Sequence, residues 1–142
     1  MYKRQNEGNF IELNLFKDHS FDAPVREKVL QKETNDIVLD MLVETVNSSN
    51  GTASKARLRE KIVAGKTGTA KESLEEATYS ATFAGFVPHD EPELLAVVVL
   101  NGLSGEDYSG GRVSAPVFSR LMQQIFMSVS YTHLTLPTTP YV

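Results

Sequence analysis

Hydrophobic and polar residues follow two different periods along this chain. Residues 10–16 alternate between apolar and polar side chains, which predicts a half-buried strand, and residues 25–30 are predicted to form another short strand. Apolar residues recur at helical spacing from about Asp36 to Val46, which predicts an amphipathic helix with cap candidates at residues 34–36. Its expected apolar stripe consists of Ile37, Val38, Met41, Leu42 and Thr45.

The second half of the chain predicts three strands and a helix. β-Branched and aromatic residues favour strands from about Arg59 to Thr69, Tyr79 to Val87 and Glu93 to Asn101, the last two joined as an antiparallel hairpin. After a glycine-rich loop, a helix is predicted with Ser114 as its cap and Pro116 in its first turn. Its expected buried stripe is Val117, Phe118, Leu121, Met122 and Ile125.

The order of these elements predicts an α/β chain of the α+β type, in which a mostly antiparallel sheet is flanked by helices. The two ends continue no periodicity, and both resemble stretches that recur when the ends of environmental sequencing reads are translated. We therefore expect residues 6–127 to form the folded part. Residues 1–5 are expected to be extraneous, and residues 128–142 to be an extraneous or disordered tail.

The composition mainly excludes certain kinds of partner, bond and membrane segment. The net charge is −4 and the 14 basic residues are scattered, which argues against binding to nucleic acid or to an anionic membrane surface. The absence of cysteine excludes disulfides, thiolate metal ligands and a thiol nucleophile. The longest apolar run, Leu94 to Leu100, is much shorter than the roughly 20 residues that a membrane-spanning helix needs.

The tetrapeptide Lys66-Thr67-Gly68-Thr69 carries the candidate chemistry. A Lys-Thr-Gly triplet on an edge strand is one of three elements that penicillin-binding proteins and serine β-lactamases use. An exposed strand edge can hold an extended acyl donor, and the threonine hydroxyls with the lysine ammonium suit a carboxylate. Gly68 allows close approach, and the Thr69 N–H is placed to help stabilise an oxyanion.

Other interpretations of the tetrapeptide are weaker. A phosphate-binding loop would require glycine where this chain has Glu60, whose carboxylate would repel phosphate. From the tetrapeptide alone, a chance Lys-Thr-Gly on a strand of unknown purpose stays open. No serine here is followed by lysine three places later, so a serine nucleophile is expected to lie outside this chain. Residues 48–50 satisfy Ser-x-Asn literally, but we interpret them as a solvated helix exit.

Several ordered blocks resemble the C-terminal part of the penicillin-binding transpeptidase domain, most closely that of class B enzymes that build septal peptidoglycan. These blocks are APVREKVLQKETNDIVLDMLVETV, KIVAGKTGTAKE, YSATFAGFVP, LLAVVVLNGL and YSGGRVSAPVF. The resemblance implies part of a β-lactamase/transpeptidase-like fold whose helical lobe is missing from this chain. One sheet face is then expected to be partly uncovered and apolar, with poor stability in isolation.

The resemblance also implies roles for individual residues. Lys66 and Thr69 match catalytic positions, the latter through its oxyanion amide, and Thr67, Gly68 and Thr69 match positions that bind substrate. Residues 108–111, Tyr-Ser-Gly-Gly, match a family loop before the last helix, for which we expect an architectural role. No metal or organic cofactor is implied.

The parent function implied by the resemblance is serine D,D-transpeptidation of peptidoglycan stem peptides that end in D-Ala-D-Ala. β-Lactam antibiotics and division-complex proteins are the expected partners, and nucleic acid is not. The expected location is the bacterial inner membrane with a periplasmic catalytic domain, the anchor lying outside this chain. A D,D-carboxypeptidase or serine β-lactamase fragment, or a non-catalytic penicillin-binding sensor module, remains as an alternative.

Overall fold

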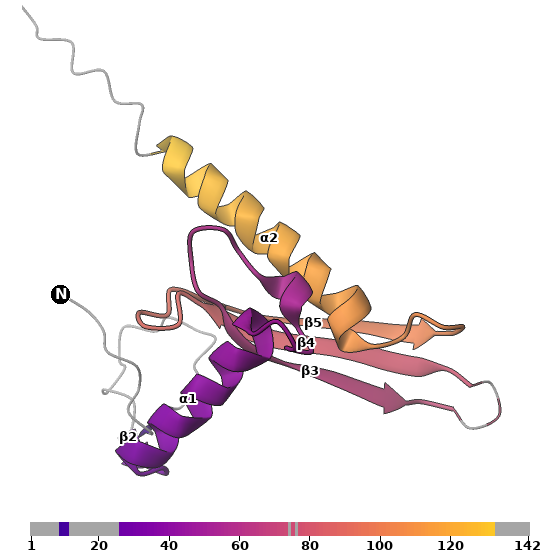
Figure 1. The fold of residues 1–142 in the computed structure, drawn as a ribbon, viewed down its shortest axis with the longest axis horizontal. Helices are drawn as coiled ribbons and strands as arrows, with labels where there is room; N and C mark the ends of the chain where they lie inside the picture. Colours follow the sequence, from indigo (N-terminus) through magenta and orange to yellow (C-terminus); the bar gives the residue numbers. More distant parts are fainter. Residues whose placement is uncertain (1–8, 12–25, 74, 76, 133–142) are drawn as a thin grey trace, which may run out of the picture.

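The computed structural model describes residues 9–11, 26–73, 75 and 77–132. In this part of the chain, helices and strands succeed one another in the predicted order (Figure 1). The elements are β1 (Asn9–Ile11), β2 (Arg26–Lys28), α1 (Lys32–Asn47), the 3-10 helix η1 (Ser54–Ala56), β3 (Ala64–Lys71), β4 (Tyr79–Val87), β5 (Leu94–Leu103) and α2 (Gly110–Thr132). The predicted α+β class is confirmed.

Strands β3, β4 and β5 form an antiparallel sheet with β4 in the middle. β3 is therefore one edge of this sheet and β5 is the other. The predicted hairpin of β4 and β5 is confirmed, and β4 has the predicted bounds. β1 and β2 pair with each other in a separate two-stranded sheet, while residues 12–16 of the predicted first strand lie outside the described residues.

The core lies between the sheet and α2. Phe83 of β4 is fully buried, and its ring meets Phe118 of α2 edge-on with the ring centroids 4.9 Å apart. Both rings exclude water from the centre of the interface, so their burial supplies much of the hydrophobic stabilisation. The buried cluster consists of Val46, Ala53, Ala56, Val63, Phe83, Val87, Ala115, Phe118 and Met122.

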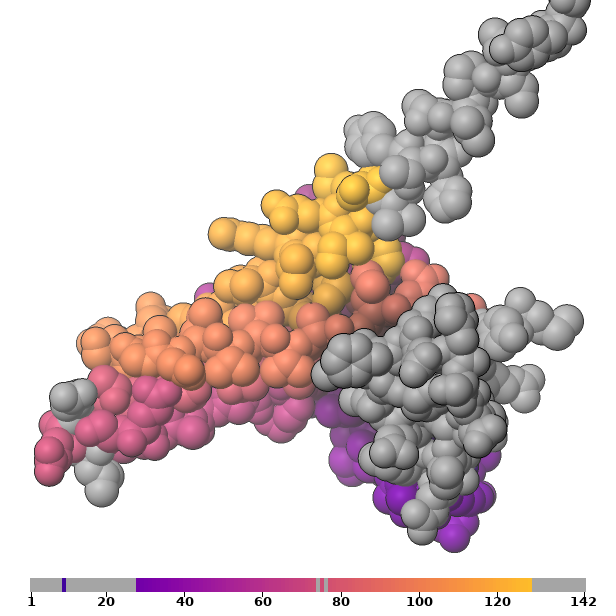
Figure 2. Space-filling view, turned by 180° about the vertical axis from the view of Figure 1, so that it is seen from behind, coloured from indigo at the N-terminus to yellow at the C-terminus, as the bar shows by residue number. Residues whose placement is uncertain are grey.

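The opposite face of the sheet is open along β5. Leu95, Val97 and Val99 project from this face and are 73%, 57% and 52% exposed. Figure 2, seen from behind, shows the orange atoms of β5 uncovered along one side of the molecule. The expectation of an apolar, partly uncovered sheet face is confirmed for the described residues.

Helix α1 was predicted with a longer buried stripe than it has. It packs on β3 and η1, and Val46 in its last turn is fully buried. Ile37, Val38 and Met41, expected to be buried, are exposed. The reason is visible in Figure 1, where α1 touches the rest through its C-terminal end and points away at its N-terminal end.

The start of α1 also differs from the prediction. The helix begins at Lys32, not Asp36, and its cap position is Gln31, which makes no side-chain cap hydrogen bond. The predicted cap at residues 34–36 is therefore wrong. An exposed first turn lets water satisfy its N–H groups, so the helix does not have to begin at a capping side chain.

Helix α2 begins at Gly110, five residues before the start that a cap at Ser114 predicts. Ser114 is therefore inside the helix and is buried, and its hydroxyl donates to the Ala81 carbonyl at 3.0 Å. Pro116 also lies inside the helix, not in its first turn. The buried stripe also differs from the prediction: Val117 and Leu121 are exposed, and Ala115 and Ser119 lie on the side that packs against the sheet.

Strand β3 begins at Ala64, five residues later than predicted. The preceding residues turn toward α2, where the Lys61 ammonium lies 4.8 Å from the centroid of the Phe126 ring. This cation–π contact and the turn take the segment out of the sheet. Within the described parts of the chain, neither helix combines the length and apolar character that crossing a membrane requires.

Replacing Phe83 by alanine should strongly destabilise the chain, because a fully buried aromatic ring leaves a cavity against α2. We expect a loss of about 3–5 kcal/mol in the free energy of unfolding, or loss of folding if the chain is less stable than that. Val99→Ala, on the open face, is the matched control and should cost less than about 1 kcal/mol. Urea unfolding followed by circular dichroism measures both; equal losses would contradict the assignment of the two faces.

Candidate active site

Lys66, Thr67, Gly68 and Thr69 lie within β3, an edge strand, and are exposed or half-buried. Successive strand residues point to opposite faces of a sheet. Thr67 and Thr69 stand opposite Phe83 and Ala81 on the α2 side, whereas Lys66 and Gly68 are on the other side. The tetrapeptide is thus presented along an open backbone edge and is not enclosed in the core.

The Lys66 side chain turns back around the strand edge toward Thr67. Its ammonium donates to the Thr67 carbonyl at 2.8 Å and lies 3.4 Å from the Thr67 hydroxyl oxygen. An ammonium can only donate hydrogen bonds, so the Thr67 hydroxyl accepts in this pair. A positive charge and a hydroxyl are therefore combined at one point of the edge, as recognition of an anionic group requires.

The Thr69 hydroxyl is held by the first residue of α2. The Gly110 N–H donates to the Thr69 hydroxyl oxygen at 3.2 Å. Because that oxygen already accepts a hydrogen bond, the hydroxyl hydrogen can be directed at another acceptor. The arrangement leaves Thr69 ready to act as a donor.

The Tyr-Ser-Gly-Gly segment makes contacts that fix α2 to the sheet. A side chain at Gly110 would place its Cβ 2.2 Å from the Thr82 carbonyl oxygen and 2.6 Å from that of Gly68. The Tyr108 ring stacks on Tyr79 with ring centroids 3.9 Å apart and planes 13° apart. These contacts are architectural, and they place the start of α2 beside the β3 residues of the candidate site.

Gly68 has a different environment from Gly110. A Cβ at Gly68 would meet the Thr82 Cβ at 3.5 Å, an ordinary van der Waals distance. The packing described here therefore does not require glycine at position 68. Without a side chain, Gly68 leaves its part of the exposed strand accessible to close approach.

Thr52 also reaches the candidate site, although the sequence pattern does not predict it. Its hydroxyl oxygen lies 3.2 Å from that of Thr67. Thr52 belongs to a segment rich in Asn, Ser, Gly and Thr, which the sequence predicts as a loop with no further role. No local pattern distinguishes Thr52 from the neighbouring hydroxyl residues, because its contact with Thr67 depends on how the segment between α1 and β3 folds against the sheet.

The Ser-x-Asn match at residues 48–50 is not brought to the tetrapeptide by these contacts. Ser48 is the C-cap of α1, its N–H donating to the Glu44 carbonyl, and its hydroxyl accepts from the Asn50 N–H at 3.3 Å. The Arg57 guanidinium donates to the Val46 carbonyl at 2.8 Å and to the Ser48 carbonyl. These bonds satisfy carbonyls at the helix end, which agrees with its interpretation as a helix exit.

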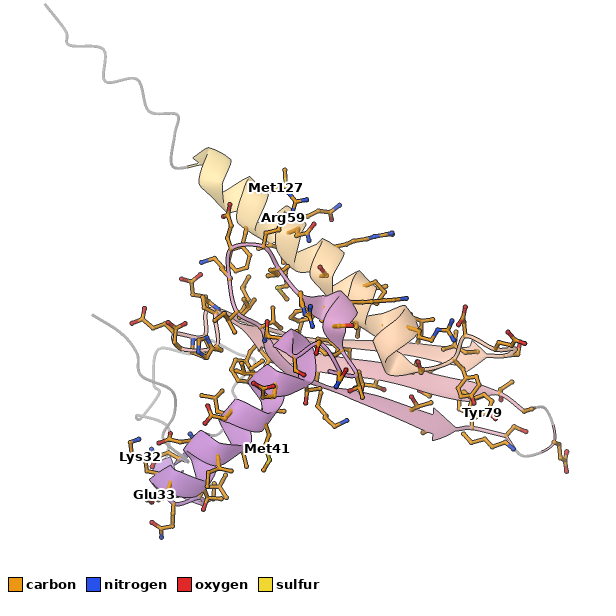
Figure 3. The ribbon with its side chains drawn as sticks, in the orientation of Figure 1. Lys32, Glu33, Met41, Arg59, Tyr79 and Met127 are labelled. Atoms are coloured by element: carbon orange, nitrogen blue, oxygen red, sulfur yellow. The ribbon has the colours of Figure 1, made fainter. Side chains whose placement is uncertain are left out.

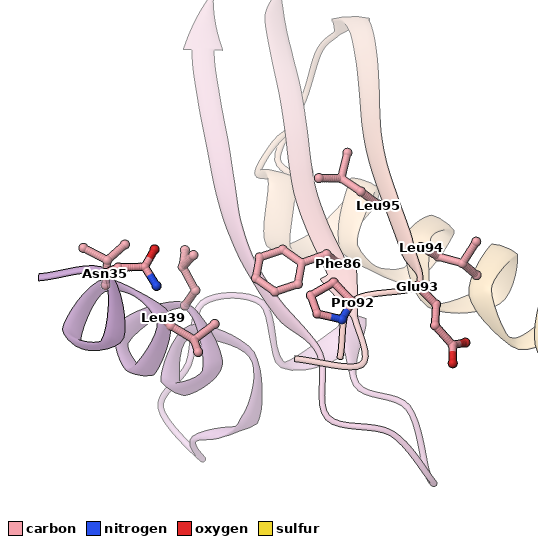
Figure 4. A pocket seen from close by; sticks show the side chains of 9 residues that line it. Asn35, Leu39, Phe86, Pro92, Glu93, Leu94 and Leu95 are labelled. Atoms are coloured by element: carbon pink, nitrogen blue, oxygen red, sulfur yellow. The ribbon is translucent and has the colours of Figure 1, made fainter. Parts of the chain in front are cut away.

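Two pockets lie away from the tetrapeptide. One, of about 360 Å³, lies between α1 and the sheet, where Leu39 faces Phe86 and Leu95 (Figure 4). The other, of about 420 Å³, lies beside the C-terminal half of α2, where Figure 3 shows Arg59 near Met127 and far from Tyr79. Among the described residues, no group of three or more His, Cys, Asp or Glu side chains is placed to hold a metal ion.

Comparison with known proteins assigns this arrangement to a family. The family model described as the penicillin-binding protein transpeptidase domain matches residues 3–123. The chain belongs to this family. The resemblance stated from the sequence blocks is thereby confirmed, while the boundaries at residues 6 and 127 stay predictions.

Two curated relatives of this transpeptidase-domain chain carry the same name, peptidoglycan D,D-transpeptidase FtsI. The one from Buchnera aphidicola subsp. Schizaphis graminum is 36% identical over 83% of this chain and 21% of the relative. The one from Escherichia coli K12 is 33% identical over 77% of this chain and 19% of the relative. The chain therefore spans about a fifth of the length of these relatives.

A solved structure agrees with the fold of this family member. The apo transpeptidase domain of Burkholderia pseudomallei penicillin-binding protein 3 superimposes with a TM-score of 0.70 and 27% sequence identity. The match covers 94% of this chain and 40% of that structure. The arrangement of the described sheet and helices is therefore that of a transpeptidase domain.

The two glycines beside the edge should respond differently to replacement by alanine. Gly68→Ala should change the free energy of unfolding by no more than about 0.5 kcal/mol, because its Cβ makes an ordinary contact. Gly110→Ala forces a methyl group into two backbone carbonyls and should cost about 1–3 kcal/mol or more. Thermal unfolding of both variants tests this; a large loss for Gly68→Ala would show that position 68 is reserved for packing and not for a ligand.

Proposed function

We propose that this chain is part of a peptidoglycan D,D-transpeptidase and that β3 forms the wall of its active site that holds the acyl donor. The observation that carries the proposal is the open edge at Lys66–Thr69, where an ammonium and two hydroxyls are presented beside unpaired strand backbone. An extended peptide can add to such an edge through its main chain while its terminal carboxylate meets the charge and the hydroxyls.

The reaction is acyl transfer through a serine that this chain does not supply. That serine attacks the carbonyl of the D-Ala-D-Ala bond and releases D-alanine, and the acyl-enzyme then passes to an amine of a neighbouring stem peptide. Lys66 lowers the energy of the anions that form near the serine, and the Thr69 N–H helps to hold the oxyanion. Thr67, Gly68 and Thr69 bind the substrate.

The context of the whole protein follows from the family resemblance. Its acceptor chemistry, its inhibition by β-lactams, a periplasmic domain anchored in the inner membrane and division-complex partners are all part of the proposal. Transfer is favoured over simple hydrolysis because the curated relatives from Buchnera aphidicola and Escherichia coli are both named as transpeptidases.

The 142-residue chain alone should form no covalent adduct with a fluorescent penicillin, because none of its serines is followed by lysine three places later. A complete transpeptidase that contains this chain should be labelled stoichiometrically under the same conditions. Fluorescence after denaturing electrophoresis measures both. Labelling of the short chain would reveal a nucleophile within it and would remove the proposed division of roles.

Lys66→Ala in the complete protein should slow penicillin acylation by about 10²-fold or more, because a charge beside the reacting groups is lost. Lys71→Ala is the matched control, since Lys71 is an exposed lysine at the far end of the same strand. We expect the control to acylate within about twofold of the parent. Stopped-flow rates distinguish the two variants, and an unchanged rate for Lys66→Ala would exclude its catalytic role.

A further inference from the structure

Thr52 lies in a turn that is fixed on both sides by the last turn of α1. The Ala53 N–H donates to the Thr45 carbonyl at 3.0 Å, and Ala53 is fully buried. A side chain at Gly51 would bring its Cβ to 2.3 Å from the same carbonyl oxygen. The backbone around Thr52 is therefore packed tightly even though the Thr52 side chain itself is exposed.

Helix α2 closes on Thr52 from another direction. A Cβ at Gly111 would lie 2.0 Å from the Thr52 carbonyl oxygen and 3.6 Å from the Thr67 methyl carbon. Thr52 thus stands where the end of α1, the start of α2 and the middle of β3 meet. Because its backbone is held by three elements, Thr52 can place its hydroxyl beside Thr67 at little further entropic cost.

The hydrogen-bond capacities of the three polar groups define what Thr52 does. A threonine hydroxyl donates one hydrogen bond and accepts two, whereas an ammonium only donates. When Lys66 and Thr52 both donate to the Thr67 oxygen, the Thr67 hydrogen is free to point outward. A carboxylate accepts only, so the Thr67 hydroxyl can donate to it in this arrangement; in the reverse one, in which Thr67 donates to Thr52, the Thr67 hydrogen is already used.

We propose that Thr52 is a positioning residue whose hydroxyl orients the Thr67 hydroxyl toward the carboxylate of the acyl donor. The inference rests on the proposed function and deepens it, because it names a residue outside the Lys-Thr-Gly-Thr segment that sets recognition of an anionic ligand. Thr52 acts through Thr67, so its removal weakens capture of the carboxylate and leaves the acyl-transfer step itself unchanged.

The test uses a complete transpeptidase that contains this chain, with Thr52→Val as the main variant. Valine keeps the branched shape and removes the hydroxyl. Acylation is measured with benzylpenicillin, which carries a free carboxylate, and with its methyl ester, which does not. We expect Thr52→Val to lower the second-order rate with the free acid about tenfold, because the hydrogen bond from Thr67 to the charged carboxylate is no longer oriented, and to leave the rate with the ester unchanged.

Two further variants separate positioning from support of the fold. Thr52→Ser restores the hydroxyl and should return the free-acid rate to within about twofold of the parent. Thr45→Val removes a neighbouring hydroxyl that donates to the Met41 carbonyl within α1, and it should not alter the ratio of the acid and ester rates. Thermal unfolding of every variant reports the contribution to stability.

The outcomes separate this inference from the proposed function. Equal slowing of acid and ester by Thr52→Val, or no slowing of either, would overturn the positioning role while labelling of the parent protein still supported a transpeptidase. The positioning role would also be overturned if Thr52→Val reduced kcat and left KM unchanged for a carboxylate-bearing peptide, because Thr52 is expected to act on binding and not on the acyl-transfer step. If the parent protein with an intact Thr52 is not labelled, the proposed function itself fails.

Discussion

The close contact between the start of α2 and the backbone of β3 and β4 is the constraint on which the candidate site depends. Gly110 and Gly111 allow it, because a Cβ at either position would penetrate a carbonyl group of Gly68, Thr82 or Thr52. The same contact brings the Gly110 N–H to the Thr69 hydroxyl. The packing of α2 on the sheet and the hydrogen bond to Thr69 therefore depend on the same contact. Because the Gly110 N–H occupies an acceptor site of the Thr69 hydroxyl, the position of α2 favours Thr69 as a donor to another group.

The two faces of the sheet have different roles: the face toward α2 is packed into the core, and the other face is exposed along β5. On the α2 side, Phe83 and Phe118 form the buried centre, and Thr67 and Thr69 continue that face beyond it to the edge. A rigid core next to the hydroxyls limits their movement, which matters because binding groups must be held close to their productive geometry. Lys66 starts from the other side and reaches Thr67 around the edge, so the polar groups meet at the strand backbone.

The sequence predicts what depends on local pattern and misses what depends on contacts between distant segments. The bounds of β4 and the hairpin with β5 follow from residue type and turn chemistry, and the Lys-Thr-Gly-Thr segment is visible as a motif. The start of α2 was wrong because Ser114 has the character of a cap, yet the glycine pair lets the helix begin earlier against the sheet. Thr52 was missed because its contact with Thr67 spans separate elements.

The two edges of the sheet differ in a way that bears on which of them meets a ligand. β5 consists of Leu94–Leu103 without a charged residue, and an apolar edge of this kind favours permanent cover or aggregation. β3 carries Lys66 and Lys71, and lysines on an edge oppose pairing with another chain while leaving the backbone accessible. A strand that must stay open for a transient ligand needs this protection. Under the proposed function, the charge at Lys66 serves recognition and also keeps its own edge free.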